Sequence, residues 1–272
     1  MAINYLIYDG TKTTELGITI AGAGAFNSPA RRGEMIQIPG RNGSLWMDEG
    51  CFENIDVRYP AFMGTFDEEE FRTKLMEVRS YFGSKGNDYK RLEDTYNPEE
   101  YRLGVFKEAI EADPVHHNRA GGITLTFDCK PQRYLKIGDE PQAFYEPGTI
   151  TNPTMFDALP VIAVTGNGRI NISGHLITVS GITETIYIDS ELQEAYIPGG
   201  VEEELTEENG ITITDELLIP IIVHKRPLEA ISMNSHVAFR DYKFPTIAPG
   251  EQPVTFDSGI QSLTIYPRWW RL

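Results

Sequence analysis

The stretch VIAVTGNGRINISGHLITVSGITETIYIDS, residues 161–190, indicates the class of fold most directly. It contains four short apolar segments that are rich in Ile and Val, separated by turns that contain Gly, at intervals of roughly eight to twelve residues. This rhythm is typical of a β-sandwich. Thr165-Gly166-Asn167-Gly168 offers two glycines for positive φ, and we expect it to form a hairpin turn. The sequence therefore predicts an all-β sandwich in the second half of the chain.

The first half also contains strand patterns. Alternating apolar residues predict strands near residues 3–8, 16–20, 54–59, 101–110 and 123–129. Between them, Pro39-Gly40 and Asn42-Gly43 are turn dipeptides, and Asn-Gly suits a type I′ hairpin. The segment 105–112 is also compatible with a helix, because KEAIEA contains good helix formers.

One amphipathic helix is predicted between Asp67 and Gly83. Asp67 and Glu70 have the spacing of a capping box, with Asp in place of the usual Ser or Thr. Apolar residues follow on one helical face, and glycines after them favour the end of the helix; these apolar residues are Phe71, Leu75, Val78 and Phe82.

A Pro- and Gly-rich segment between Pro131 and Pro153 predicts a boundary between two domains. We expect an α+β domain with one helix over residues 1–135 and a β-sandwich domain over residues 136–272. The predicted fold class is mainly β.

Composition and charge exclude several classes of function. The chain has 272 residues and a net charge of −16, which disfavours binding to nucleic acid or to anionic membrane surfaces. Cys51 and Cys129 are too few for a disulfide framework. We find no signal peptide and no transmembrane segment, so synthesis and folding in a cytoplasm are expected.

No motif predicts catalysis, a cofactor or a metal site. His116 and His117 are adjacent, so on a strand they would point to opposite faces and serve poorly as joint metal ligands. Gly22-Ala23-Gly24 and Gly166-Asn167-Gly168 lack the third glycine of a phosphate-binding loop. The acidic run at 68–70 suits a helix N-terminus, and the one at 202–208 suits a solvated loop.

Six motifs, in order, resemble those of the phage distal tail proteins, which belong to siphophages and prophages of Gram-positive bacteria. The resemblance covers nearly the whole chain, and its second half is the more specific; the motifs are IPGRNGSL, FDCKPQRY, NPTMFDALPVIAVTGNG, YIDSELQEAY, FPTIAPGEQPV and YPRWWRL.

The resemblance implies a structural role in the virion, at the tip of the phage tail, without catalysis. Distal tail proteins form hexameric rings, singly or as two stacked rings, mainly through their N-terminal domains. These rings lie between the tail tube protein and the tail-associated lysin or fibre proteins. Their C-terminal domain is a galectin-like β-sandwich, which in some relatives docks receptor-binding proteins.

Two groups of residues are candidates for contacts between subunits or domains. Arg31, Arg32, Arg41 and Asn42 lie on turn-rich segments of the first half and suit charge-assisted contacts. Arg268, Trp269, Trp270 and Arg271 lie at the C-terminus. Because neighbouring residues on a strand face opposite ways, we expect one tryptophan in the core and the other on the surface, stacked beside Arg268 or Arg271.

Two other functions stay open at this point. The first is a lectin-like module for cell-wall polysaccharide, for which Trp269, Trp270, Tyr187 and Tyr196 are the candidate aromatic residues. The second is a hydrolase on the same scaffold, which no motif supports.

Overall fold

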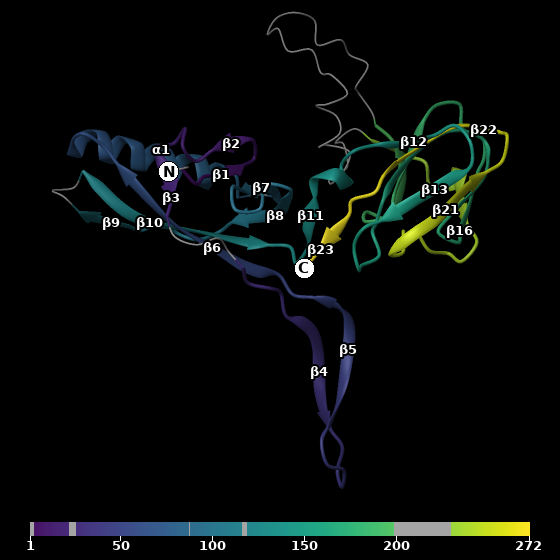
Figure 1. Cartoon of the computed structure of the whole chain (residues 1–272), viewed down its shortest axis with the longest axis horizontal. Coiled ribbons are helices and arrows are strands. Elements are labelled where there is room, and N and C mark those ends of the chain that lie inside the picture. Colours follow the sequence, from purple (N-terminus) through teal and green to yellow (C-terminus); the bar gives the residue numbers. More distant parts are fainter. Residues whose placement is uncertain (1–2, 22–25, 87, 116–118, 199–229) are drawn as a thin grey trace, which may run out of the picture. The chain divides into compact units, whose positions relative to one another are not determined.

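The structure, a computed structural model, describes residues 3–21, 26–86, 88–115, 119–198 and 230–272. It divides into two compact units, which are unit 1 (Met1–Arg133 with Leu272) and unit 2 (Tyr134–Arg271). Antiparallel strands dominate both units, and α1 (Glu68–Ser84) is the one α-helix of the described residues (Figure 1). The predicted mainly β fold class with one helix is therefore confirmed.

Unit 1 is built on an antiparallel sheet in which the central strands are the longest. Its strands, in spatial order, are β2 (Thr11–Lys12), β1 (Leu6–Tyr8), β7 (Lys90–Asp94), β8 (Glu100–Phe106), β10 (Ala120–Cys129), β6 (Ile55–Gly64) and β3 (Ile18–Ile20). A further strand, β9 (Ala112–Val115), pairs with the first residues of β10, whereas β8 pairs with its last residues.

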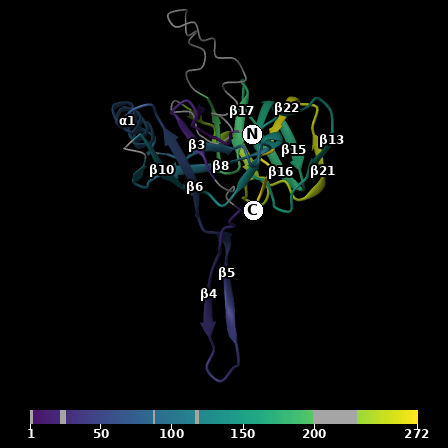
Figure 2. The same ribbon diagram turned by 60° about the vertical axis from the view of Figure 1, so that its left-hand side comes forward.

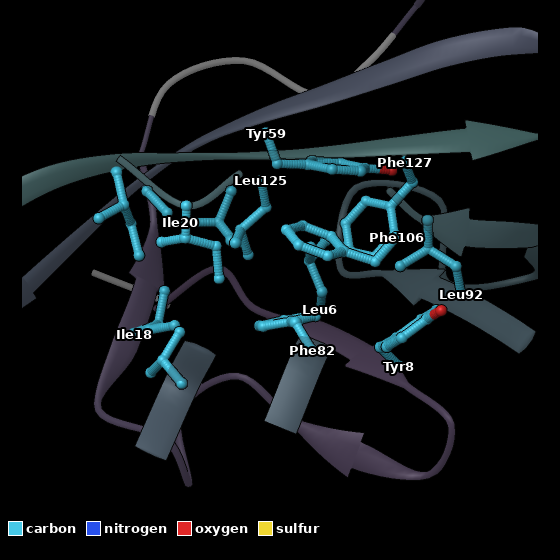
Figure 3. Packing of buried hydrophobic residues seen from close by; sticks show 14 of the residues in the cluster. Leu6, Tyr8, Ile18, Ile20, Tyr59, Phe82, Leu92, Phe106, Leu125 and Phe127 are labelled. Carbon is cyan, nitrogen blue, oxygen red and sulfur yellow. The ribbon is translucent and has the colours of Figure 1, made fainter. Parts of the chain in front are cut away.

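Helix α1 covers one face of this sheet. Residues of β6 alternate between buried and exposed along the whole strand, so one face of β6 points into the core. Phe71, Val78 and Phe82 of α1 belong to the same buried cluster. The rings of Phe82 and Phe106 lie 4.7 Å apart, and Figure 3 shows them beside Tyr8 and Phe127.

The ends of α1 confirm the local signals in the sequence. The Asp67 carboxylate accepts a hydrogen bond from the Glu70 backbone N–H (2.8 Å). Glu70 in turn accepts one from the N–H of Phe66, one residue before the cap (3.0 Å). The first bond occupies a backbone donor that the first helical turn leaves unpaired, and the second fixes the residue that precedes the cap.

The segment after β8 departs from both expectations for it. The strand ends at Phe106, and residues 107–111 form neither strand nor helix. Ile110 is buried, and its carbonyl accepts a hydrogen bond from Arg79 Nη2 of α1 (3.3 Å). Packing against α1 therefore overrides the helix propensity of KEAIEA.

A separate two-stranded sheet completes unit 1. It consists of β4 (Arg31–Gln37) and β5 (Ser44–Phe52), which, within the part of the chain that the structure describes, pair only with each other. In both Figures 1 and 2 this hairpin extends clear of the main sheet of unit 1. We call it the arm.

Unit 2 contains two antiparallel sheets that share one core of mainly Ile, Val and Leu side chains. The first sheet comprises β12 (Gln142–Phe144), β22 (Ile260–Tyr266), β14 (Val161–Gly166), β17 (Ile186–Asp189), β18 (Glu194–Ile197) and β19 (Ile231–Ser232). The second comprises β13 (Gly148–Asn152), β21 (Gly250–Phe256), β15 (Gly168–Ile172), β16 (His175–Val179) and β20 (Val237–Phe239). Short 3₁₀ helices lie at Lys136–Gly138 and Asn234–His236.

The turn at Thr165–Gly168 is not the predicted hairpin. It joins β14 of the first sheet to β15 of the second, so the two strands it connects do not pair. Gly166 has a φ of +103°, and a Cβ at this position would lie 2.4 Å from the carbonyl oxygen of Gly259. Gly166 is therefore needed where the chain passes from the first sheet to the second, and not in a β-hairpin turn.

The first strands of unit 2 pair with its last strands. β11 (Arg133–Leu135) pairs with β23 (Trp270–Arg271), β12 with β22, and β13 with β21. The two ends of this stretch of chain are thus held together by three strand pairs in succession. Within the described residues, no helix is long and apolar enough to span a membrane.

Candidate assembly surfaces

The arm is held in shape by backbone pairing and by two glycines. Gln37 and Ser44 are the last paired residues, which leaves a six-residue loop over 38–43. Gly40 and Gly43 have φ values of +78° and +81°, but Asn42 does not have a positive φ. The expectation of a turn is confirmed, whereas the type I′ geometry is wrong because it requires positive φ at both central residues.

Large apolar side chains of the arm are exposed to solvent. Their exposed fractions range from 37% to 64%, and none belongs to either hydrophobic core; they are Met35, Ile38, Leu45, Trp46 and Met47. Because neighbouring residues of a strand face opposite ways, Met35 and Trp46 lie on one face of the arm and Leu45 and Met47 on the other. Exposed apolar surface of this kind is typical of an interaction site. The arm is also a two-stranded sheet with two open edges, which favours covering by another chain.

Trp46 is positioned by a glycine on the facing strand. A Cβ on Gly33 would lie 2.5 Å from the Trp46 ring and 2.5 Å from the Met47 carbonyl oxygen. The indole therefore lies flat across β4, and Met35 pairs with Trp46 in the register of the two strands. This arrangement orders a broad apolar surface although no core lies beneath it.

The predicted arginine cluster is split between the two ends of the arm. At the base, Arg31 bonds to Asp48 (2.8 Å) and Arg32 lies 3.7 Å from Glu49. The Gly50 N–H and Arg31 together lower the pKa of Asp48 below its ordinary value. Arg41 and Asn42 lie exposed in the loop at the tip. Among the described residues Arg41 has no ion-pair partner.

The C-terminal motif is mostly internal to unit 2. Trp269 is 2% exposed and belongs to the core. Arg268, with a φ of +55°, is buried and donates from Nη1 and Nη2 to the two carboxylate oxygens of Asp189 (2.9 and 2.6 Å). Asp189 also accepts from the backbone N–H groups of Glu191 and Leu192, so its charge is compensated in the interior.

Trp270 is the tryptophan that reaches the surface of unit 2. Its ring stacks on Phe156 at 4.4 Å, and its Nε1 donates to the carbonyl oxygen of Asp157 (3.0 Å). The sequence predicted that Arg268 or Arg271 would stack on this tryptophan. The stacking partner is instead the ring of Phe156. Arg271 is exposed. The candidate contacts at the C-terminus narrow to Trp270 and Arg271, because Arg268 and Trp269 are enclosed.

The aromatic residues considered for sugar binding do not form one exposed set. The ring centroids of Tyr187 and Tyr196 lie 6.0 Å apart in a stacked arrangement. Tyr196 is fully buried, however, and Trp269 is only 2% exposed. Burial raises the pKa of the Tyr196 hydroxyl well above its ordinary value. Two of the four candidate side chains therefore offer no face to a ligand.

A groove on unit 1 was not foreseen from the sequence. It has a volume of about 510 Å³ and lies between the outer face of β6–β10 and the segment that follows β8. Glu108, Glu111 and Asp113 line it on the side of that segment. The sequence signal is the acidic content of KEAIEAD, which overlaps the predicted strand 101–110 and the alternative helix 105–112.

Within the described residues, no three His, Cys, Asp or Glu side chains are grouped closely enough to hold a metal ion. Both cysteines are free thiols; Cys51 is exposed on the arm, and burial raises the pKa of Cys129 to about 12. The predictions for His116, His117, Gly22-Ala23-Gly24 and the acidic run 202–208 lie outside the described residues.

Comparison with known proteins identifies the fold. No family model matches the sequence, and no curated protein matches it. Among solved structures, the SPP1 Dit (gp 19.1) protein, described as a hub adsorption apparatus of phages that infect Gram-positive bacteria, is 11% identical. It matches with a TM-score of 0.67 over 97% of this chain and 98% of that chain.

A chain of the phage P2 baseplate, in its activated conformation with Ca, is 8% identical and matches with a TM-score of 0.51 over 97% of both chains. At these identities the comparison shows a shared fold. The resemblance to distal tail proteins that the sequence motifs suggested is thus confirmed at the level of the fold.

Proposed function

We propose that this protein is the hub of a phage tail tip, a structural component of the virion without catalytic activity. The observation that carries the proposal is the match to the SPP1 hub protein over nearly the full length of both chains. A match of this extent includes both units and not one common module. The order of sequence motifs supports the same role independently.

In this proposal six copies form a ring, singly or as two stacked rings, and the arm supplies contact between neighbours. The arm has exposed apolar side chains and open strand edges, which are features of a surface that another chain covers. In a ring built from one kind of chain, each copy contacts its two neighbours through two different surfaces, which are complementary to each other. The arm is one of these two surfaces and contacts the neighbouring copy.

The ring joins the tail tube protein on one side to the tail-associated lysin or fibre protein on the other. Receptor-binding proteins are further partners, for which Trp270 and Arg271 of unit 2 are candidate contacts. No cofactor and no nucleic acid is needed for this role, and the net charge of −16 per chain disfavours contact with phosphate backbones.

The first test is the mass of the purified protein in solution, by light scattering after size-exclusion chromatography, over a range of protein and salt concentrations. Six copies of 30.6 kDa give about 184 kDa. Salt is varied because six chains of charge −16 repel one another, and screening at ~0.15 M shortens this repulsion to about 8 Å.

A variant with a shortened arm is the matched control. Replacing residues 33–50 by Asn-Gly keeps the pairing of Arg31 with Phe52 and removes the exposed apolar residues of β4 and β5. We expect a folded monomer, with an unchanged circular dichroism spectrum apart from the lost strands. A variant that still assembles would show that the arm is not the contact. A wild-type chain that stays monomeric, even with its tube and lysin partners present, would refute the ring.

A further inference from the structure

A small cavity in unit 1 is lined by side chains of β7 and β8. Its volume is about 10 Å³, which is room for one water-sized ligand. Leu92 of β7 pairs with Arg102 of β8, and directly paired residues point to the same face of a sheet. Asp94 and Glu100, two residues further along each strand, lie on that face as well and also line the cavity. The strand register therefore directs the Arg102 side chain to the cavity.

Arg102 is a buried cation whose donors are unused. The residue is 5% exposed, and its Nη1 and Nη2 are both enclosed without a hydrogen-bond partner among the described residues. Enclosed polar groups are ordinarily hydrogen-bonded, because a buried donor without an acceptor has lost its hydration and gained nothing in return. The two nitrogens therefore indicate a ligand that accepts hydrogen bonds.

The carboxylate of Asp94 lines the same cavity, but its hydrogen bonds come from other donors. It accepts from the Tyr59 hydroxyl (2.9 Å) and from the backbone N–H groups of Tyr96 (3.0 Å) and Asn97 (2.8 Å). These bonds stabilise the carboxylate charge without any contribution from Arg102. Asp94 therefore does not act as the acceptor for the guanidinium.

A second arginine adds positive charge to the lining of the cavity. Arg133 Nη1 lies 3.6 Å from Glu100 Oε2, so the charge of Glu100 is balanced by Arg133. Burial lowers the pKa of Arg102, and the like charge of Arg133 lowers it further. The charge that lacks a partner in the cavity is thus positive, which favours an anionic ligand.

We propose that the cavity binds one monoatomic anion of the size of chloride, held by Nη1 and Nη2 of Arg102. A volume of about 10 Å³ leaves no room for an anion of several atoms. The guanidinium presents its N–H donors in one plane, so two of them can donate to the same ion. All lining residues belong to unit 1, and the site does not depend on the proposed ring.

Urea unfolding in chloride and in gluconate, at equal ionic strength, tests the site. Alkylation of Cys129 in a Cys51→Ser background reports on unit 1, because Cys129 belongs to the core of that unit. An anion that binds only the folded chain lowers the unfolding equilibrium constant, and above its Kd each tenfold rise in chloride should lower this constant about tenfold. Gluconate is too large for the cavity and should have no such effect.

Arg102→Met should abolish the chloride dependence, because it removes both the donors and the charge and keeps a side chain of similar length. The matched control is Arg72→Met, since Arg72 is an exposed arginine of α1 that lies 3.5 Å from Glu68. This control should retain the full dependence. An equal chloride dependence in Arg102→Met would place the anion elsewhere and overturn the inference.

A direct measurement on the wild type keeps the inference testable if Arg102→Met does not fold. Crystals grown in bromide should show anomalous scattering from one ion within hydrogen-bond distance of the Arg102 guanidinium. Identical unfolding in chloride and gluconate, with no bromide beside Arg102, would mean that the cavity holds only water and would overturn the inference. Acetate that stabilises unit 1 as strongly as chloride would overturn the assignment of a monoatomic anion.

Discussion

Replacing Asp189 by Asn should destabilise unit 2 strongly, because it leaves Arg268 charged in the interior. Asn keeps the Oδ1 acceptor for the N–H groups of Glu191 and Leu192, so the turn after β17 is retained. The guanidinium loses its charged partner, which is bound through both carboxylate oxygens. The Leu159 carbonyl (3.2 Å), the Glu191 carboxylate (3.5 Å) and the amide oxygen of the new Asn remain near the guanidinium.

The expected loss follows from the burial of both partners. The side chains of Arg268 and Asp189 are 1% and 0% exposed, so water cannot replace the missing charge. Breaking a buried pair by removing one partner costs about 3–5 kcal/mol. We expect about 3 kcal/mol for Asn, at the lower end, because the amide oxygen still accepts a hydrogen bond.

Urea unfolding of the full chain, followed by tryptophan fluorescence, measures this loss. Trp269 and Trp270 both report on unit 2, and the exposed Trp46 contributes a nearly constant background. Arg268→Met and the double variant complete a thermodynamic cycle. The φ of +55° is retained in all variants, and any non-Gly residue is strained there, so backbone strain cancels.

The double variant removes both buried charges and should be less destabilised than the sum of the single variants by at least about 2 kcal/mol. A loss below about 1 kcal/mol for Asp189→Asn, or additive single effects, would refute the reasoning. It would mean that water reaches the pair or that Glu191 replaces Asp189.

Three further outcomes are expected. At pH 8 an alkylating reagent should modify Cys51 within minutes and leave Cys129 unmodified until the chain unfolds, since burial raises the Cys129 pKa to about 12; equal rates, read by mass spectrometry, would contradict this. Asp67→Ala should lower the free energy of unfolding by about 1 kcal/mol through loss of the helix cap, whereas Asp67→Ser should retain most of it in the same urea titration. Burial opposes the lowering of the Asp128 pKa, but hydrogen bonds from Lys107 and Asn54 lower it overall, so these contacts stabilise the fold above the ordinary pKa of Asp and their contribution disappears as pH falls through the lowered value. Lys107→Met should therefore lower the free energy of unfolding only slightly at pH 7, because Lys107 is solvent-exposed, and the difference from the wild type should shrink as the pH of the urea titration is lowered; a difference that grows at acidic pH would contradict this.

The elements that the sequence predicted well are those whose signals are local. Helix α1 is specified by Asp67, by Glu70 and by apolar residues of helical spacing, all within one segment. The turn of the arm is likewise specified by two glycines within four residues. Such signals need no knowledge of distant parts of the chain.

The features that the sequence could not predict depend on distant partners. The partner of Arg268 is Asp189, 79 residues earlier, so an arginine beside tryptophans gave no sign of an internal ion pair. The same limit explains why Gly166 was expected in a hairpin, since only the sheet order shows that its two strands belong to different sheets. The groove joins β10 to the segment after β8, and neither suggests a site alone.

The arm illustrates why an apolar strand pattern does not determine burial. Leu45, Trp46 and Met47 are residues that usually lie in a core, yet no strand of the described residues pairs with β4 or β5 on their outer edges. A single hairpin is marginally stable alone in water. An ordered, solvent-facing apolar surface on such a hairpin is what the proposed ring would cover.

The pairing of first and last strands in unit 2 has a consequence for when assembly can begin. Leu135 donates its backbone N–H to the Trp269 carbonyl oxygen, and Arg268 donates its own to the Gly138 carbonyl oxygen, both at 2.8 Å. Contacts of such sequence separation form slowly, because the loop between them must close first. Unit 2 therefore cannot complete its fold until Trp269 has been synthesised, whereas the arm of unit 1 lies entirely within residues 1–133. The arm, which we propose for ring assembly, is thus available before unit 2 is complete, so a chain that ends before Trp269 should still compete for places in the ring. Adding such a truncated chain to the full-length protein should lower the yield of complete tail tips, and an unchanged yield would show that ring assembly requires a folded unit 2.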